Sequence, residues 1–175
     1  VDASMGLTPL EGVIMGTRSG DIDPAFVEYL CNKENLTVSE VLNILNKKSG
    51  MLGMTGISSD YRDVSAAAEA GNQDAINCLE AYAYRIIKSI GSYAAMGGVD
   101  VITFTAGLGE NAIPLRETIC KAFEFMGLEF DSEANNCRGV EKIITKEGSK
   151  ITACVIPTNE EIAICEETVE LVKGK

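Results

Sequence analysis

The sequence contains no histidine and no tryptophan among its 175 residues. Without histidine, neither a His-containing zinc site nor a Ser-His-Asp triad can form within this chain. The six cysteines include no C-x-x-C pair, and Cys78, Cys120 and Cys154 lie in apolar patterns. This spacing favours reduced core thiols in a cytoplasmic protein over a disulfide framework. No apolar run is long enough to span a bilayer, and no signal peptide pattern opens the sequence.

Basic residues are also scarce, with 15 against 26 acidic residues and a net charge of −11. This balance argues against nucleic acid or an anionic membrane surface as the main partner. A nucleotide site would need local help from glycine loops, single arginines or a metal. A composition of 46% hydrophobic and 23% charged residues is that of a globular protein, and the length of 175 residues suggests one domain over residues 1–175. Because the sequence begins at Val1, we also expect a fragment of a longer protein.

Capping signals predict a series of helices in the first half of the chain. Thr8 and Thr37 each open a capping box, Pro24 suits a first helical position, and Asn72 precedes a long amphipathic stretch. We expect helices over 9–18, 24–33, 38–46 and 73–96, a short helix from Asp63 or Ser65 to residue 70, and a glycine-rich loop over 49–56. The short helices in succession predict a helical insertion over about residues 23–70.

The second half of the chain has strand patterns as well. Residues 99–105 are β-branched and aromatic, which predicts a short buried strand, and a glycine turn follows at 106–109. We then expect a helix over 111–126, strands over 140–145 and 151–156, and a last helix over 160–172. The two later strands either pair or lie as successive edge and inner strands. A long helix leading into a buried strand is typical of α/β architecture.

Two features could bind an anion, although each also has an ordinary structural explanation. Gly107, Leu108, Gly109, Glu110 and Asn111, called the glycine segment below, follow a strand, and glycine lets the backbone approach a phosphate closely. The same pattern is a common way to turn from a strand into a helix. At the end of a predicted helix, an arginine at position 18 could contact the last carbonyls or clamp a phosphate or carboxylate.

Two further features suit a nucleotide with a metal ion. Asp60, Tyr61 and Arg62 offer a carboxylate, a ring and a cation that could grip an adenosine group, or they form a surface turn. Glu160 and Glu161 begin the last helix, where they could complement its dipole or hold Mg²⁺ beside phosphates. The glycine turn and the Glu160 turn both follow candidate strands. Open α/β sheets bind ligands at that end of their strands.

Five motifs in order resemble the acetate kinase family: SMGLTPLEG at residues 4–12, MGTRSGDIDP at 15–24, NKKSG at 46–50, FTAGLGEN at 104–111 and PTNEE at 157–161. The resemblance covers essentially the whole chain and identifies it with the C-terminal portion of that family. It implies an incomplete ribonuclease H-like domain of the actin-like ATPase type. Such a domain has a mixed sheet with helices on both faces, and belongs to the sugar kinase, Hsp70 and actin superfamily.

The resemblance also implies an activity, the reversible transfer of a phosphoryl group from ATP to acetate, giving ADP and acetyl phosphate, with Mg²⁺ or Mn²⁺. Arg18 matches the arginine that stabilises the transferring phosphoryl group, and Glu160 matches the magnesium-binding glutamate. The Asp60–Arg62 stretch and the glycine segment match the nucleotide-binding segments. Family members are implied to be cytoplasmic homodimers that pair through this domain.

Family chains are implied to be more than twice as long as this one. A catalytic aspartate, a histidine, a phosphate loop and most of the acetate pocket would lie in the part that is not represented here. We therefore expect the chain alone to be inactive. Two alternatives stay open: a relative that acts on butyrate or propionate, and a fragment that dimerises without catalysis.

Overall fold

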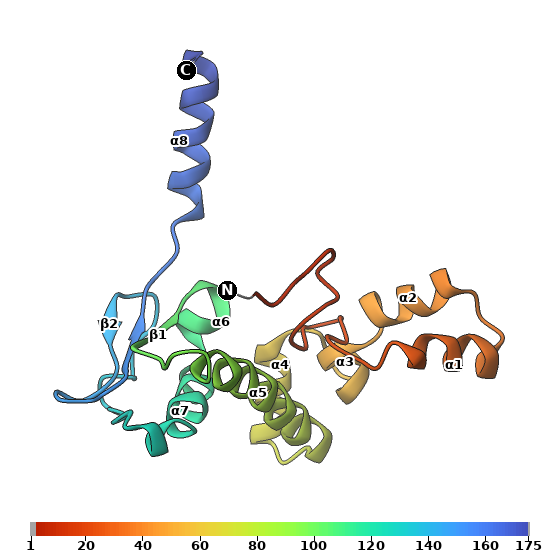
Figure 1. Ribbon diagram of the computed structural model, residues 1–175, viewed down its shortest axis with the longest axis horizontal. Helices are drawn as coiled ribbons and strands as arrows, with labels where there is room; N and C mark the ends of the chain where they lie inside the picture. Colours follow the sequence, from red (N-terminus) through yellow and green to blue (C-terminus); the bar gives the residue numbers. More distant parts are fainter. Residues whose placement is uncertain (1–2, 175) are drawn as a thin grey trace. The chain divides into compact units, whose positions relative to one another are not determined.

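The computed structural model describes residues 3–174 and divides the chain into two compact units, Val1–Gly98 and Val99–Lys175 (Figure 1). Gly97 and Gly98, both with positive φ, separate the units. Glycine adopts such a conformation without steric cost. No helix within residues 3–174 is both long and apolar enough to cross a membrane. The single domain over residues 1–175 stays a prediction.

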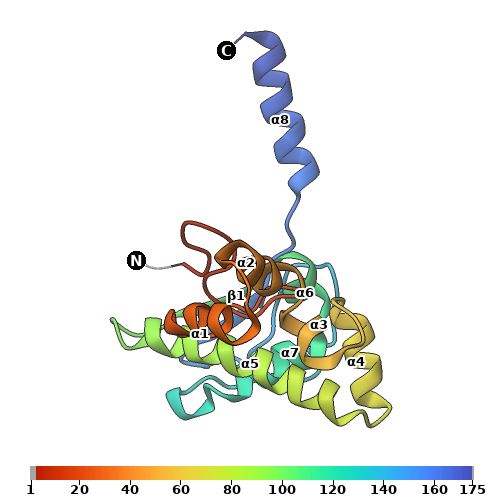
Figure 2. The same cartoon turned by 90° about the vertical axis from the view of Figure 1, so that its right-hand side faces the viewer.

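The first unit is helical. It contains α1 (Ala25–Glu34), α2 (Val38–Lys47), α3 (Gly50–Thr55), α4 (Tyr61–Glu69) and α5 (Gln73–Ala94). In both views α1 lies alongside α2, and α4 lies alongside α5 (Figures 1 and 2). Helices α1 to α4 fall within the range predicted as a helical insertion.

The capping predictions for α2 and α5 are confirmed. The Thr37 hydroxyl accepts from the Glu40 N–H at 3.3 Å, and the Glu40 carboxylate accepts from the Thr37 N–H at 2.7 Å. The Asn72 side chain accepts from the Ala75 N–H at 3.0 Å. These bonds satisfy N–H groups that a helix start leaves without partners. Helix α1 is confirmed too, and Asn35, in the left-handed region at φ +54°, ends it.

The predicted helix over residues 9–18 is wrong, because this stretch runs as turns and bends. Gly12 has a φ of +104°, and its N–H donates to Asp21 Oδ1 at 2.7 Å. The Val13 N–H donates to the Ser4 hydroxyl at 3.0 Å. Polar side chains thus take the N–H groups that a helix would bond to its own carbonyls. Their distance in sequence hides this competition from a local capping signal.

Two other boundaries in the first unit need correction. The predicted loop over 49–56 instead forms α3, which begins with buried Gly50 and Met51 and ends at Gly56, at φ +66°. Helix α4 begins at Tyr61, because the cap is Asp60 and not Asp63 or Ser65.

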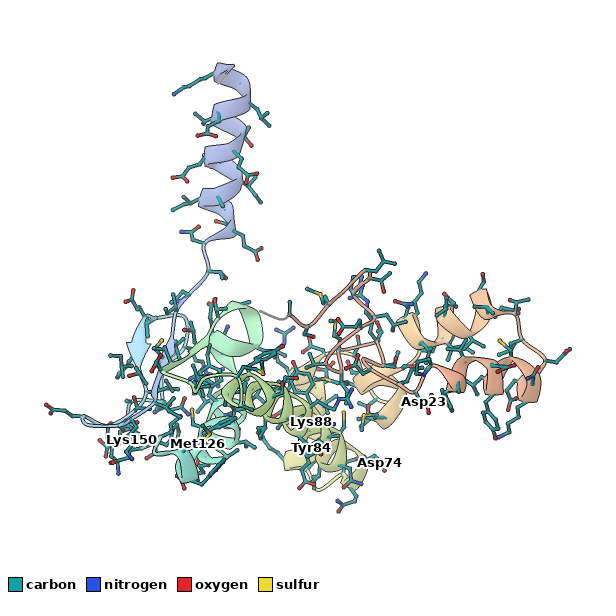
Figure 3. The ribbon with its side chains drawn as sticks, viewed as in Figure 1. Asp23, Asp74, Tyr84, Lys88, Met126 and Lys150 are labelled. Carbon is teal, nitrogen blue, oxygen red and sulfur yellow. The ribbon has the colours of Figure 1, made fainter. Side chains whose placement is uncertain are left out.

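The core of the first unit lies where α3, α4 and α5 meet. Met51, Val64, Ala75 and Cys78 are buried there, and partly buried Tyr61, Leu79 and Tyr82 pack against them. The amphipathic pattern predicted for residues 73–96 is therefore confirmed in part, since the N-terminal half of α5 packs against α3 and α4. Tyr84 and Lys88 are exposed on the same helix (Figure 3).

The second unit carries a small mixed sheet. Its elements are β1 (Val101–Phe104), α6 (Ala106–Asn111), α7 (Ile113–Lys121), the 3-10 helix η1 (Glu124–Met126), β2 (Lys142–Ile143), β3 (Thr152–Val155) and α8 (Glu160–Lys173). The central strand β3 lies parallel to β1 and antiparallel to β2. In register, Val101 lies opposite Thr152 and Phe104 opposite Val155. This confirms a mixed α/β unit and the pairing of the two later strands.

The second unit differs from the prediction in three places. The glycine turn folds as helix α6, and the helix expected over 111–126 is divided into α7 and η1. Ala112, at ψ +77°, interrupts the helical path before Pro114. Strand β1 is half-buried, since Ile102 and Phe104 face the core whereas Val101 is 54% exposed.

Tight backbone packing joins the end of η1 to the turn before β3. Gly127 adopts φ +94°, and its carbonyl accepts from the Lys150 N–H at 2.9 Å. Lys150 accordingly lies near Met126 (Figure 3). Of the cysteines predicted in the core, Cys78 and Cys120 are buried and Cys154 is half-buried.

Candidate functional site

Residues 15–19, here called the arginine loop, are fixed by backbone hydrogen bonds to the α2–α3 region. The Ser49 N–H donates to the Thr17 carbonyl at 3.0 Å, and the Ser19 N–H donates to the Leu45 carbonyl at 2.9 Å. The start of α3 adds two more donors to this loop. Gly50 makes the approach possible: its φ is +61°, and a Cβ there would lie 2.2 Å from the Met15 carbonyl oxygen. The loop is therefore held in one conformation.

The Arg18 side chain is half-buried and has few partners. Its Nη1 lies 3.6 Å from the Met15 sulfur. Within residues 3–174, no carboxylate forms an ion pair with this guanidinium, although the chain is strongly acidic. A fixed arginine without an anionic partner is suited to bind one from solution. The alternative, in which Arg18 contacts the last carbonyls of a helix, is wrong because no helix precedes it.

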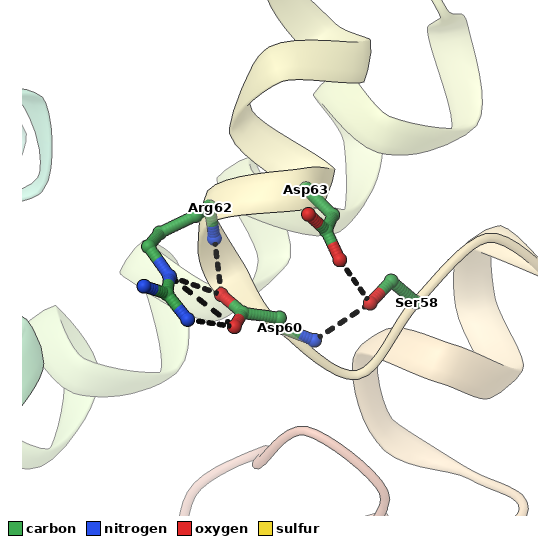
Figure 4. A network of polar contacts seen from close by, with 4 residues as sticks. All are labelled: Ser58, Asp60, Arg62 and Asp63. Carbon is green, nitrogen blue, oxygen red and sulfur yellow. Dashed lines mark hydrogen bonds and ion pairs between the residues drawn. The ribbon is translucent and has the colours of Figure 1, made fainter.

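Asp60 and Arg62 bind each other at the start of α4 (Figure 4). Asp60 accepts from the Arg62 N–H at 2.8 Å, and its carboxylate also accepts from the Arg62 guanidinium. These bonds from Arg62 lower the pKa of Asp60 to about 2. On the other side, Ser58 donates to Asp63 at 2.7 Å and accepts from the Asp60 N–H. The Arg62 side chain is 86% exposed, so its outer face is open to a ligand.

Tyr61 lies in a different environment from its neighbours. Its ring centroid is 6.1 Å from that of Tyr82, at an angle of 56°. Burial raises the pKa of both phenols. Because the ring packs against the α3–α4–α5 core, only its remaining surface could stack on an adenosine group. Its assignment to nucleotide binding stays a prediction.

The arginine loop touches the residues just before Asp60. A Cβ on Gly16 would lie 2.5 Å from the Ser59 carbonyl oxygen, so this position requires a close approach of two backbones. Asp21 supports the same region: it accepts from the Gly12 N–H, and Arg85 lies 3.6 Å from its carboxylate. The first unit thus brings Arg18 and the Asp60–Arg62 stretch into one neighbourhood.

In the second unit, the glycine segment forms most of α6. Thr105 precedes it in extended conformation without a side-chain cap, and Ala106 adopts φ +57°. For a residue with a Cβ this conformation is strained, and such strain often marks functional sites. Gly109 lies against the strand, where a Cβ would approach the Phe104 carbonyl carbon to 3.0 Å. At Gly107 a Cβ would meet no atom within 4 Å, so this position is open to a ligand.

Glu110 and Asn111 make contacts within the protein. Glu110 Oε1 accepts from the Thr158 N–H at 2.8 Å and from the Thr158 hydroxyl at 3.0 Å. The Asn111 amide donates to the Gly107 carbonyl at 2.9 Å. Glu110 therefore links the glycine segment to the turn before α8, where Glu160 lies. The second unit brings these predicted residues together, although their roles toward a nucleotide stay predictions.

Glu160 is exposed at the first position of α8, after Asn159, which caps the helix by accepting from the Ile162 N–H at 3.1 Å. No cation pairs with Glu160 among the described residues. Residues 3–174 contain no cluster of three or more His, Cys, Asp or Glu side chains able to hold a metal by themselves. One carboxylate fits Mg²⁺, which keeps several waters and takes further oxygens from phosphates.

Comparison with known proteins shows which family the chain belongs to. The family model described as the acetokinase family matches residues 1–166. The chain belongs to this family. It is 58% identical over 173 residues to the acetate kinase of Lachnoclostridium phytofermentans, a match that covers 98% of this chain and 44% of that protein. This acetokinase-family chain thus spans less than half the length of that relative.

Solved structures of the family resemble the fold of this chain. The crystal structure of Porphyromonas gingivalis acetate kinase matches with a TM-score of 0.90 and 47% identity, over 97% of this chain and 43% of that one. A propionate kinase from Francisella tularensis matches with a TM-score of 0.84 and 40% identity, over 92% and 41% of the two chains.

Several residues that support the site were not singled out from the sequence. Asp21, Gly50, Ser59 and Thr158 act through contacts between segments far apart in the chain. Three of these residues do lie in the family motifs, Asp21 in MGTRSGDIDP, Gly50 in NKKSG and Thr158 in PTNEE, whereas Ser59 lies in none.

Proposed function

We propose that this chain provides the nucleotide side of an acetate kinase site, in which ATP and acetate give ADP and acetyl phosphate. The observation that carries the proposal is Arg18, whose guanidinium forms no ion pair with a carboxylate of residues 3–174, on a loop fixed by Gly50 and Ser49, in a chain of the acetokinase family. We further propose that the full protein is cytoplasmic. The mixed sheet of the second unit supports assignment to an incomplete ribonuclease H-like domain of the actin-like ATPase type.

In the proposed reaction, a carboxylate oxygen of acetate bonds to the γ-phosphorus while the bond to the ADP oxygen breaks. Negative charge spreads over the transferring group, so catalysis depends on positioning and charge stabilisation. Arg18 stabilises that charge, and the Asp60–Arg62 stretch and the glycine segment hold the nucleotide. Glu160 would hold Mg²⁺ or Mn²⁺, which neutralises phosphate charge when bound.

The chain alone is proposed to be inactive, because the acetate pocket and the remaining catalytic groups would come from the part that its relatives have in addition. A hydroxamate assay of the 175-residue chain with ATP, Mg²⁺ and acetate tests this. Acetyl phosphate formation at the rate of a full-length relative would contradict it.

A chimera tests the proposed activity directly. This chain replaces the matching part of the L. phytofermentans acetate kinase, and acetyl phosphate formation is measured. We expect activity, and a loss of about 10³-fold or more in Arg18→Ala, the range seen for arginines that stabilise phosphoryl transfer. The control is Arg138→Ala, which removes an exposed arginine from the second unit. A chimera that binds MgADP but makes no acetyl phosphate, or that tolerates Arg18→Ala, refutes the proposal.

A second acid substrate is supported by the likeness to the Francisella propionate kinase. Because most of the acid pocket is proposed to lie outside this chain, the chimera would report the substrate specificity of the L. phytofermentans enzyme. Rates of the full-length protein on acetate, propionate and butyrate distinguish the candidates. Higher kcat/KM for propionate or butyrate would replace acetate as the proposed substrate.

Dimerisation is supported by an exposed apolar surface on α1 and α2. Phe26 and Tyr29 stack with centroids 6.1 Å apart, and they are 42% and 54% exposed. Val38 and Leu42 on α2 are also exposed. We propose that a second copy covers this surface. Sedimentation should then show a dimer that Tyr29→Glu dissociates, and a monomer at high concentration would contradict the proposal.

A further inference from the structure

Arg116 on α7 is completely buried, which is unusual for a charged side chain. Its guanidinium donates a long hydrogen bond to the Cys137 sulfur at 3.9 Å and four shorter ones to uncharged oxygens. The acceptors are Asn135 Oδ1 at 2.8 Å and the carbonyls of Gly109 at 2.9 Å, Asn135 at 2.9 Å and Cys137 at 2.7 Å. Within residues 3–174, no carboxylate forms an ion pair with it.

Such an arrangement is costly compared with an ordinary ion pair. Burial penalises the charged form and lowers the pKa of Arg116, although an arginine stays protonated in proteins. By contrast, Lys121, further along α7, forms an exposed ion pair with Glu117, the usual arrangement for a basic side chain. Hydrogen bonds from a cation to carbonyls recover part of the desolvation cost, but only in a fixed geometry. The planar guanidinium of Arg116 therefore requires its acceptors to lie at defined positions.

The acceptors belong to two segments far apart in sequence. Asn135 and Cys137 lie in the loop before β2, and the Asn135 amide also donates to the Ile113 carbonyl at 3.1 Å, at the start of α7. The third acceptor residue, Gly109, lies in the glycine segment. Arg116 therefore ties the glycine segment to α7 and to the loop before β2.

This bond acts on a segment whose backbone is under strain. Ala106 is held at φ +57°, directly before the glycine segment. Gly109 is pressed against Phe104 on one side and its carbonyl is bonded by Arg116. Strained conformations persist only where the surroundings determine them. Arg116 is a fully buried side chain that bonds this segment through the Gly109 carbonyl.

We infer that Arg116 is a positioning residue, which holds the glycine segment through the Gly109 carbonyl in the conformation that receives the nucleotide. The inference rests on the proposed function, since it takes that segment as part of the nucleotide site. Arg116 itself does not touch the ligand, because its side chain is completely buried.

The test compares the full chain with its Arg116→Lys and Lys121→Ala variants. Lysine keeps the charge but lacks the planar fork that bonds several acceptors at once. Lys121→Ala removes a basic residue of the same helix without touching the Gly109 carbonyl. Hydrogen exchange is measured without nucleotide at residues 106–112 and in β3, and MgADP affinity is measured by calorimetry.

For Arg116→Lys we expect hydrogen exchange at residues 106–112 to rise about tenfold or more, with exchange in β3 unchanged. We expect MgADP affinity to fall about tenfold, which corresponds to the loss of one charge-assisted hydrogen bond. Lys121→Ala should match the unaltered chain. Unchanged exchange at 106–112 overturns the inference, and so does equal loss of protection in β3, which would make Arg116 a general core residue. Faster exchange with unchanged affinity also overturns it. Failure of the unaltered chain to bind MgADP instead refutes the proposed function, while the exchange measurement still tests whether Arg116 fixes the segment.

Discussion

Replacing Gly50 by alanine should disturb the arginine loop more than any conservative change nearby. The new Cβ would lie 2.2 Å from the Met15 carbonyl oxygen and 2.9 Å from the Arg18 nitrogen. A φ of +61° costs a residue with a Cβ about 1–2 kcal/mol, and overpacking against rigid backbone adds about 1–3 kcal/mol. The lower entropy of the unfolded alanine chain returns about 0.4–1 kcal/mol. We expect a net loss of about 2–4 kcal/mol in the free energy of unfolding.

Guanidinium denaturation of the chain measures this loss, and Gly91→Ala is the matched control. Gly91 lies in α5 of the same unit, and a Cβ there meets no atom within 4 Å. That substitution should stabilise the unit by about 0.5–1 kcal/mol, because alanine favours a helix. In the chimera, Gly50→Ala should also reduce acetyl phosphate formation about tenfold or more, because Arg18 is displaced. If Gly50→Ala is as stable as the unaltered chain, the loop does not depend on this close approach.

Three further predictions follow from single positions. Because hydrogen bonds from Arg62 lower the pKa of Asp60 to about 2, Asp60 stabilises the fold above pH 4 and this contribution is lost as the pH falls towards 2. The difference in thermal midpoint between the unaltered chain and Asp60→Asn should therefore shrink over that range, and a constant difference would contradict the assignment. Ala106→Gly should raise stability to urea by about 0.5–1 kcal/mol by relieving its left-handed conformation, and a decrease would mean that no strain is stored there. Burial raises the pKa of Cys120 to about 12, so iodoacetamide at pH 8 should modify exposed Cys165 and spare Cys120 in mass spectra of the native chain, whereas equal labelling would contradict its burial.

The sequence predicted those parts of the fold that depend on neighbouring residues. The Thr37 capping box needs only residues three positions apart, and the Asn72 cap is equally local. The predicted helix over 9–18 failed for the opposite reason. Its Thr8 signal is present, but Asp21 and Ser4 take the N–H groups of Gly12 and Val13 from nine positions away.

In the candidate site too, residues within contiguous motifs were predicted and contacts between distant segments were not. Arg18, Glu160 and the glycine segment were found from motifs, which are contiguous. Arg116 has its acceptors up to 21 positions away, and Thr158 lies 48 positions from Glu110. Such partners come together only when distant segments pack against each other, and no spacing in the sequence indicates these pairs. For Tyr61, the motif did not indicate that the ring packs against the core of the first unit, which leaves less of its surface for a ligand.

The bond between Glu110 and Thr158 also has a consequence for the order of folding. It closes a loop of 48 residues, and it lies just beyond the parallel pairing of β1 with β3. Contacts of such long separation pay a large loop-closure entropy and form slowly. The glycine segment and the turn carrying Glu160 should therefore meet late, after the two strands have paired. Changes at Glu110 should then speed unfolding and leave the folding rate nearly constant.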